Sequence, residues 1–393
     1  MDVFLTSIDF SNLDTSKVTN MNFMFNNCRS LISLDLSHLD VSNVETTENM
    51  FQSCSLTSLD LSNFNRNQII SMLSMFMNSK FNYLDLSNFD TSHVINMENL
   101  FYGCSNLVSI NISNINISRV TNMKSMFMSC TSLVSLDLSN LDTSNVINME
   151  SMFGNCQNLI SLNLSNFRTS KVETMRFMFG SCFKLSSLDI SSFDTFQVKN
   201  MARMFDSCSS LTSVDLSNIN TCNVETMESM FESCSSLTSV DLKKLNTSQV
   251  QNMNNMFEFC ANLVFLDLSN FDFEKVIHMD YMINFCSNLE YVNLNSTIFQ
   301  SSVSDNQLFE NNYPKILTCS INEEWKKYFS YYQKIICINH FNNITLEYFC
   351  FMNNKLPYNK YTCDLCGLNY HEKYNDSYNV SFINCYESLD DII

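Results

Sequence analysis

Residues 130–156 read CTSLVSLDLSNLDTSNVINMESMFGNC, and close copies of this unit fill most of the chain. Nearly every copy ends in a cysteine, and most copies are 26 residues long. The span from Cys54 to Cys104 divides into two 25-residue units, with Ser79 in the place of a cysteine. Such repetition predicts a solenoid, in which each unit is one coil stacked on the next around a shared core.

Two apolar patterns follow one another within the unit. Leu133, Leu136 and Leu138 form an LxxLxL pattern whose last pair alternates with polar residues, which is the spacing of a β-strand. The turn-forming sequence LDTSNV follows. In residues 149–156, two Met, a Phe and a Cys then fall at i, i+3, i+4 and i+7, which predicts one face of a short helix.

These patterns predict an α/β repeat solenoid of about eleven units over residues 1–295, with a parallel β-sheet on one face and short helical turns on the other. We expect a right-handed leucine-rich-repeat coil. Residues 296–312 are polar and are expected to form a linker or cap, and residues 313–393 a small cysteine-rich module that continues beyond this chain. Leu5, Ile8 and Phe10 already occupy repeat positions, so we expect the sequence to begin inside a coil and to lack its N-terminal cap.

Composition excludes some classes of partner. The chain has 40 acidic and 22 basic residues and a net charge of −18. This balance argues against binding a nucleic-acid backbone, which requires Lys and Arg to replace counterions, and against docking on an anionic membrane. No apolar run reaches the roughly 20 residues of a membrane-spanning helix. The N-terminus also has no secretory signal pattern, but an incomplete N-terminus would explain that.

The repeat string LDLSNFDTS, followed by Val, two Met three residues apart, Phe and Cys, resembles the BspA-like leucine-rich repeats of bacterial and protist surface proteins. The resemblance covers about residues 5–294. It implies an extracellular, adhesive and non-enzymatic role, and it supplies no catalytic residues. Sequons of the Asn-x-Ser/Thr type permit a secreted protein without demonstrating one.

The last 80 residues are rich in Tyr, Asn and Lys and hold six further cysteines, Cys319, Cys337, Cys350, Cys363, Cys366 and Cys385. An even number of cysteines in a small segment favours structural disulfides. A zinc site formed by Cys363, Cys366, His371 and Cys385 is an alternative, and a redox CxxC is a weaker one because no βαβ pattern surrounds it. The stretch CDLCGLNYHEKYNDSYNVSFINCY resembles the growth-factor-receptor-like cysteine-rich repeats of protist surface proteins.

The cysteines and methionines of the repeat are interpreted as core residues. A free cysteine in a fixed core position behaves as a small buried hydrophobe. Cysteines on adjacent coils are close enough for a disulfide, but their side chains point in parallel, which disfavours one. The Met–Met–Phe stripe could form a hydrophobic binding groove, but packing explains it better.

A single strand position carries an acidic residue in nearly every unit. Its members are Asp9, Asp35, Asp60, Asp85, Asp137, Asp189, Asp215, Asp241 and Asp267, with Asn111, Asn163 and Asn293 as substitutes. Stacked carboxylates should raise one another's pKa. Solvent and neighbouring Ser hydroxyls could relieve the repulsion, and Ca²⁺ bridging adjacent Asp residues is the alternative. We expect no other cofactor.

The strand face is the predicted binding surface, presented to a protein or glycan ligand on another cell or on the matrix. Its candidate residues are Asp189, Asp215, Asp241 and Asp267, together with Lys243, Lys244, Phe265 and Tyr291, which interrupt a plain Ser-Asp-Ser strip. Drift near the end of the array would also explain these interruptions. We expect a cell-surface or secreted recognition protein. An intracellular scaffold is the alternative, and an enzyme is a distant third because no catalytic constellation is apparent.

Overall fold

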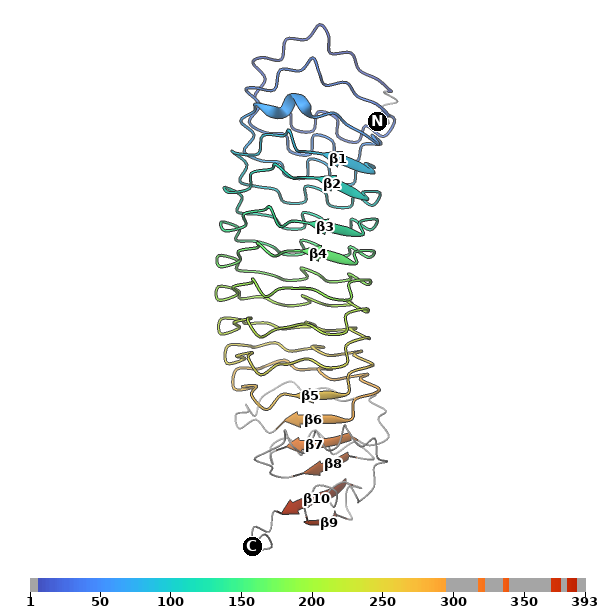
Figure 1. Cartoon of the computed structure of the whole chain (residues 1–393), viewed down its shortest axis with the longest axis vertical. Coiled ribbons are helices and arrows are strands. Elements are labelled where there is room, and N and C mark those ends of the chain that lie inside the picture. Colours follow the sequence, from blue (N-terminus) through green and yellow to red (C-terminus); the bar gives the residue numbers. More distant parts are fainter. Residues whose placement is uncertain (1–5, 295–316, 322–334, 339–368, 376–379, 387–393) are drawn as a thin grey trace.

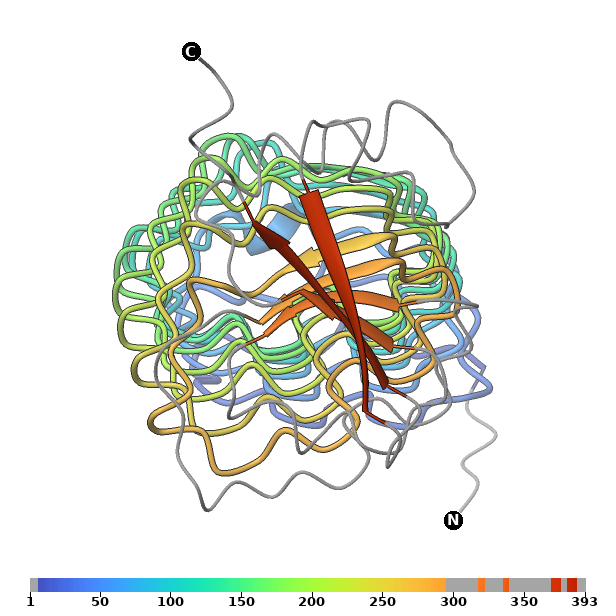
Figure 2. The ribbon, with the colours of Figure 1, turned by 90° about the horizontal axis from the view of Figure 1, so that it is seen from below.

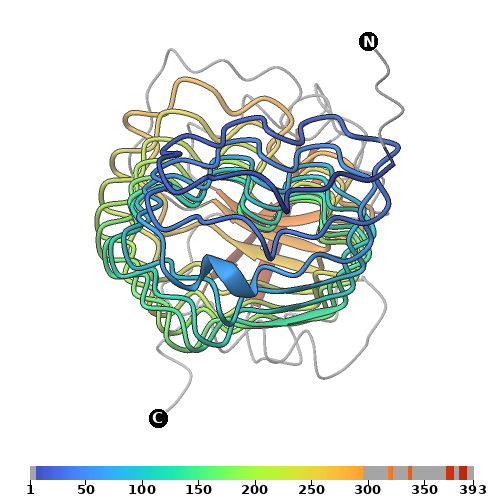
Figure 3. The ribbon, with the colours of Figure 1, turned by 90° about the horizontal axis from the view of Figure 1, so that it is seen from above.

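The computed structural model describes residues 6–294 and, beyond them, four strands: β7 (Leu317–Ile321), β8 (Ile335–Ile338), β9 (Asn369–Asn375) and β10 (Val380–Tyr386). Residues 6–294 wind into coils stacked along the long axis of the molecule (Figure 1). Viewed from either end, successive coils overlie one another in a closed outline (Figures 2 and 3). The chain is therefore a repeat solenoid, as the sequence predicts.

An unbroken ladder of parallel β-bridges joins neighbouring coils. It uses one residue per coil, 25 or 26 positions apart, just before the Met–Met–Phe segment of the unit. The eleven residues of the ladder are Asn20, Thr46, Ser71, Asn96, Asn122, Asn148, Thr174, Asn200, Thr226, Asn252 and His278. Because each residue pairs with both of its neighbours, the ladder runs through eleven coils. This position was not singled out from the sequence.

The predicted short helices are wrong. The described residues contain no α-helix, and their only helical segment is the 3₁₀ helix η1 (Ser62–Asn65). In residues 149–156, three tight turns follow one another, closed by the amides of Met152, Gly154 and Cys156, which donate to carbonyls three residues earlier. Ser151 and Asn155 have φ of 56° and 59°, in the left-handed region, so a helix cannot continue through them.

Consecutive turns reproduce the burial pattern of a helix. Met149, Met152, Phe153 and Cys156 are all fully buried, as the helical spacing requires. The amides between those that close the turns donate to the next coil: Phe153 to the Met178 oxygen at 2.9 Å, for example. In a helix these amides would bond four residues back along the same coil. Here they hold one coil to the next.

The strand side is less regular than the predicted sheet. Within residues 6–294, strands form at β1 (Tyr83–Asp85), β2 (Ser109–Asn111), β3 (Ser135–Asp137), β4 (Ser161–Asn163), β5 (Phe265–Asp267) and β6 (Tyr291–Leu294). They pair in parallel as β1–β2, β3–β4 and β5–β6. The continuous sheet expected over eleven units is therefore wrong, since the same sequence position forms no strand in the coils between these pairs.

The core consists of columns of identical residues, one from each coil. Ten Phe rings stack between Phe25 and Phe257, with neighbouring centroids 5.3–5.9 Å apart and planes within 19° of parallel. Met and Leu columns lie beside them, and their members are buried. Aromatic stacking adds about 0.5–1.5 kcal/mol per pair to the burial of each ring.

The repeat cysteines form a column of buried thiols that donate hydrogen bonds. The Sγ of Cys156 lies 3.1 Å from the carbonyl oxygen of Phe127 on the preceding coil, and the same contact recurs from Cys54 to Cys286. Ser79 replaces one cysteine and makes the same contact with its hydroxyl. Burial raises the pKa of the Cys156 thiol to about 12. The interpretation as buried, unpaired thiols is confirmed for the cysteines of this column from Cys54 to Cys260, and the hydrogen bond adds a polar role.

In the coils that have a threonine in the LDTS turn, this buried residue links the coil to the next. The Thr195 hydroxyl accepts a hydrogen bond from the Asn220 amide and donates one to the Asn220 carbonyl, both at 2.8 Å. Thr143, Thr221 and Thr247 make the same reciprocal pair of bonds with the following coil. One hydroxyl thus satisfies two partly buried backbone groups of the following coil.

Beyond residue 294, the backbone of β7 pairs in parallel with β6, followed by β8, β10 and β9 in one sheet. Cys319 of β7 and Cys337 of β8 are register partners. The linker 296–312 and the cysteines Cys350, Cys363 and Cys366 lie outside the described residues. The cysteine-rich module and its disulfides stay predictions.

Candidate functional site: the strand face

Three exposed columns make up the strand face. In the unit of β3 they are formed by Val134, Ser135 and Asp137, and Leu133 and Leu136 point into the core between them. The strands that carry these columns lie above one another along the stack (Figure 1). Because each coil adds one residue to each column, a substitution in one repeat changes a single place on this surface.

The Asp column is a series of backbone caps. The carboxylate of Asp137 accepts a hydrogen bond from the Ser139 amide, two residues on, at 3.0 Å. Asp189 and Asp215 cap the amides of Ser191 and Ser217 in the same way, at 2.9 and 2.8 Å. This use of Asp to close its own turn is a local hydrogen bond that needs no ligand.

These caps reverse the expected direction of the pKa shift. Hydrogen bonds from the Ser191 hydroxyl and amide hold the pKa of Asp189 below its ordinary value. For Asp215, the bonds from Ser217 outweigh the charge of Asp189, which raises its pKa. The expectation of mutually raised pKa values is therefore wrong, because the hydrogen bonds stabilise the charged form more than the neighbouring carboxylates destabilise it.

Within residues 6–294, strands form only where an Asp of this column is followed, on the next coil, by Asn. The register pairs are Asp85 with Asn111, Asp137 with Asn163 and Asp267 with Asn293. Successive Asp residues, such as those from 189 to 267, form no strand pair with one another. In each pair the residue after the Asp donates to the Asn carbonyl, as Leu138 does to Asn163 at 3.1 Å.

The Asn side chain explains this rule. The pKa of Asp137 is lowered first by the Ser139 amide and hydroxyl and further by a hydrogen bond from the Asn163 side chain. An amide in the second position thus replaces carboxylate repulsion with attraction. Its oxygen caps Ser165 on its own coil, at 3.2 Å.

The predicted site residues lie along one face without converging on one point. Asp189, Asp215 and Asp241 are exposed, and Asp267 is half-buried. Each belongs to a different coil, and each carboxylate is engaged by the amide two residues ahead. Within the described part of the chain, no group of three or more His, Cys, Asp or Glu side chains could hold a metal ion. Calcium on this column stays a prediction.

The remaining predicted residues form two separate features. Phe265 and Tyr291 stack with their centroids 5.2 Å apart and their planes 8° from parallel, and both are half-buried. Lys243 and Lys244 are exposed just past the strand position of their coil. In the tail, His371 pairs in register with Asn384, and Cys385 with Tyr370. Cys363 and Cys366 lie beyond the described residues, so the zinc site stays a prediction.

The sequence reasoning missed an exposed apolar patch at the opposite end of this face. Tyr83, Val108, Val134 and Ile160 are 49%, 54%, 44% and 48% exposed. They stand on four successive coils, at or just before β1 to β4. The signal was present, because the position of Val134 holds Ser186, Thr212 and Thr238 in later coils. A position that tolerates polar residues is not a core position.

Comparison with known protein families identifies the family to which the repeats belong. A family model described as a Mycoplasma protein of unknown function, DUF285, matches residues 2–83, 75–187 and 180–297. These three matches in tandem cover about three quarters of the chain. The chain belongs to the DUF285 family. The matches end close to the last described coil, so the DUF285 repeats and the solenoid are the same part of the molecule.

The solved structures similar to this DUF285 chain include leucine-rich-repeat and Toll proteins, and their TM-scores to it are low. One chain of the TLR13–ssRNA13 complex has a TM-score of 0.29 at 13% identity, with 85% of this chain and 55% of that chain covered. A leucine-rich-repeat protein of Leptospira interrogans has a TM-score of 0.23 at 14% identity, with 76% of each covered. The Toll–Spatzle complex of Drosophila gives 0.27 at 14% identity, with 93% and 47% covered. Such scores do not establish a shared fold or ligand. A comparison with curated proteins found no match.

Proposed function

We propose that this DUF285 chain is a non-enzymatic recognition or adhesion protein of the cell surface or the extracellular space. Its strand face presents polar, acidic columns to protein or glycan partners. The resemblance of the repeat to BspA-like surface proteins supports this location. The observation that carries the proposal is the patch formed by Tyr83, Val108, Val134 and Ile160.

The patch is not needed for the fold. Later coils hold Ser186, Thr212 and Thr238 at the position of Val134, and Ser at the position of Tyr83, within the same stacked architecture. Large apolar side chains exposed on successive coils of a polar face cost solvation, and clusters of this kind mark interaction sites. Aromatic and aliphatic side chains at the centre of a polar surface supply most of the binding energy of an interface.

The test replaces the patch with residues that the repeat itself uses elsewhere. Tyr83→Ser, Val108→Thr, Val134→Thr and Ile160→Thr are combined in one variant, which should fold like the original. Ile95 and Ile147, which are 40% and 42% exposed on another column, are changed to Thr as a matched control. The binding of each labelled protein to intact cultured cells is then measured. We expect the patch variant to lose most of its binding and the control to keep it.

Treating the cells with protease or glycosidase before the measurement distinguishes a protein partner from a glycan. Equal binding by the original chain and the patch variant would show that the strand face is not the contact surface. No binding by the original chain to any cell type would contradict adhesion itself.

An intracellular scaffold, the alternative function, would differ from a surface protein in the redox state of its tail cysteines. In that case the cysteines of the tail, such as Cys363 and Cys366, should be reduced, because cytosolic glutathione and thioredoxin keep thiols reduced. Protein recovered from the cells that make it is denatured, and its free thiols are counted with and without reductant. A membrane-impermeant label applied to intact cells provides the matching measure of location. Oxidised tail cysteines and surface labelling are the results that we expect.

Two features of the described residues are compatible with both locations. The column cysteines from Cys54 to Cys260 are buried, and burial raises the pKa of the Cys156 thiol to about 12, so these cysteines would remain thiols in an oxidising or a reducing compartment. No helix of the described residues is long and apolar enough to cross a membrane. The tail thiols are therefore the informative ones.

A further inference from the structure

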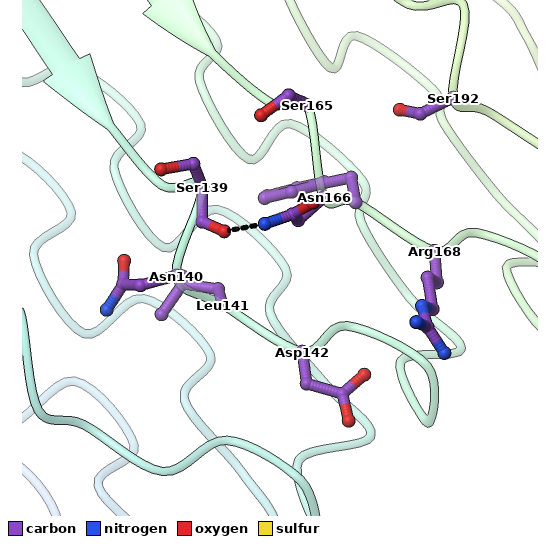
Figure 4. Close-up of a pocket in the computed structure, with 9 residues that line it drawn as sticks. Ser139, Asn140, Leu141, Asp142, Ser165, Asn166, Arg168 and Ser192 are labelled. Atoms are coloured by element: carbon purple, nitrogen blue, oxygen red, sulfur yellow. Dashed lines mark hydrogen bonds between the residues drawn. The ribbon is translucent and has the colours of Figure 1, made fainter.

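A cleft of about 500 Å³ opens at the carboxyl end of β3 and β4, on the same coils as the apolar patch. Its rim is formed by Ser139, Asp142, Ser165, Arg168 and Ser192 (Figure 4). Pockets for small-molecule ligands have volumes of roughly 300–1,000 Å³. The cleft is therefore large enough to hold one or two sugar rings.

Two departures from the repeat accompany the cleft. The first is Ser192, at a position where Asn140, Asn166 and Asn218 stand on other coils. The Asn218 side chain donates to the Ser191 carbonyl of the preceding coil at 3.1 Å, and Asn166 donates to the Ser139 carbonyl. The shorter Ser192 reaches the Leu164 carbonyl at 3.3 Å and leaves the space that an Asn amide would fill.

The second departure is Arg168, in a column that otherwise holds Asp or Asn in the regular LDTS turns. Its backbone is fixed, because its amide donates to the Thr143 hydroxyl at 2.8 Å and its carbonyl accepts from that hydroxyl at 3.0 Å. Among the ion pairs of the described residues, none involves Arg168. The guanidinium is exposed and has donor groups to offer to a ligand.

Asp142 supplies an acceptor beside this donor. It lies one coil before Arg168 in the same column, and both side chains extend from the rim of the cleft (Figure 4). Hydrogen bonds from Ser144 hold the pKa of Asp142 below its ordinary value, and the charge of Arg168 lowers it further. The carboxylate is therefore ionised at neutral pH, and the two charges balance.

We propose that this cleft binds a neutral sugar unit of a glycan, an assignment that rests on the proposed recognition function and narrows it. Arg168 donates to the oxygens of the sugar hydroxyls and Asp142 accepts from their protons. The hydroxyls of Ser139, Ser165 and Ser192 can do either.

Charge and polarity decide between ligand classes. The net charge of −18 and the balanced Asp142–Arg168 pair disfavour a carboxylated or sulfated ligand. A peptide anchor would need an exposed apolar pocket, but the Leu141 and Phe167 side chains beneath the cleft are each only 1% exposed. A neutral, hydroxyl-rich ligand matches a rim of hydroxyl, carboxylate and guanidinium groups.

The decisive variants restore the repeat. Arg168→Asp and Ser192→Asn install the residues that neighbouring coils carry at these positions, so they should fold as well as the original chain. Asn220→Asp is the matched control, since it makes a consensus change in the Arg168 column two coils away. Melting temperatures of all variants establish that the fold is kept.

Binding is measured by saturation-transfer NMR with neutral di- and trisaccharides of glucose, galactose, mannose, fucose and N-acetylglucosamine, each at millimolar concentration. We expect at least one saccharide to bind the original chain and the Asn220→Asp variant. Binding should weaken tenfold or more in Arg168→Asp and in Ser192→Asn. Sialyllactose against lactose tests the charge argument, and we expect the neutral sugar to bind more tightly.

Three outcomes would overturn the assignment: no saccharide binding at all, equal binding by both cleft variants, or tighter binding of sialyllactose than of lactose. Cell binding distinguishes a failure of the sugar assignment from a failure of the proposed adhesion function. If cells bind the original chain and the Arg168→Asp variant equally, adhesion stands and the sugar cleft does not. If a saccharide binds the cleft but no cell binds the chain, the cleft stands and adhesion does not.

Discussion

The two sides of each coil are held together in different ways. On the turn side, β-bridges run without a break from Asn20 to His278, beside stacked Phe rings and reciprocal Thr bonds. On the strand side of residues 6–294, pairing is confined to the three places where Asp precedes Asn. The turn side uses buried, neutral groups that stack favourably on identical neighbours. The strand side repeats a charged group, and identical charges do not stack favourably.

This difference separates stability from recognition in the molecule. The stacked Phe column of the core admits little change, since each ring must fit copies of itself above and below. The strand face contributes less to the contact between coils, so substitutions there alter the surface at small cost. The apolar patch, the Phe265–Tyr291 stack and the cleft at Arg168 all lie on or beside this face.

The largest expected effect is on the turn side. Phe153→Ala removes one ring from the stack, whose neighbours lie at 5.9 and 5.8 Å. Truncating a fully buried Phe costs about 3–5 kcal/mol because of lost burial and the cavity left behind. Urea unfolding measures the loss. Val134→Ala, on the exposed face, is the control and should change stability little; an unchanged midpoint for Phe153→Ala would show that the stack does not hold the coils.

The second effect concerns the threonine column. Thr195→Val keeps the shape of the side chain but leaves the Asn220 amide and carbonyl without the partner they have at 2.8 Å. Unsatisfied buried polar groups cost about 1–3 kcal/mol. Thr195→Ser retains the hydroxyl and should lose much less. If both variants lose the same amount in urea unfolding, packing of the methyl group matters and the hydrogen bonds do not.

Sequence patterns predicted the repeat and the buried columns correctly but not the local backbone. The positions of Met149, Met152, Phe153 and Cys156 could be read as core, because consecutive turns of three to four residues bury the same positions as a helix. Periodicity alone cannot distinguish the two. Ser and Asn at every fourth position, as at Ser151 and Asn155, were the available sign, since Asn in particular tolerates a positive φ.

The candidate site was predictable only in part. The alternation of apolar and polar residues in LDL predicted the strand face. The pairing rule, in contrast, depends on which residue the next coil places beside each Asp. A sequence read one unit at a time does not show that relation. The cleft was missed for a similar reason: Arg168 and Ser192 lie 24 residues apart, and each looks like ordinary variation until the coils are stacked.

A smaller effect should follow from extending the strand pairs. Asp215→Asn places an amide after Asp189, so the pairing rule predicts a new bond from the Ile190 amide to the carbonyl of residue 215. Hydrogen exchange should show slower exchange at Ile190, with a slight rise in melting temperature. Asn163→Asp is the reverse change and should speed exchange at Leu138, whose amide now donates to Asn163 at 3.1 Å. Unchanged exchange in both variants would refute the rule.

The smallest effect is the dependence of stability on pH. Because hydrogen bonds lower the folded pKa of Asp137, Asp189 and Asp215, these groups stabilise the fold above their unfolded pKa, near 4. That contribution is lost as the pH falls through the lower folded pKa. The melting temperature should therefore be level from pH 7 to about pH 5 and decline below about pH 4. A decline as the pH rises from about 4 to 6 would instead show that carboxylate repulsion dominates.

Changing Asp189, Asp215 and Asp241 together to Asn isolates the column from the other acids of the chain. Asn oxygens can cap the same amides, as Asn163 caps Ser165, so the fold should persist. The acid decline should be shallower in this variant, because three of the groups that must be protonated are gone. Melting curves at neutral pH with calcium and with chelator complete the comparison. A calcium-dependent rise in the original chain that is absent from the variant would place cations on the column, and an equal rise in both would place them elsewhere.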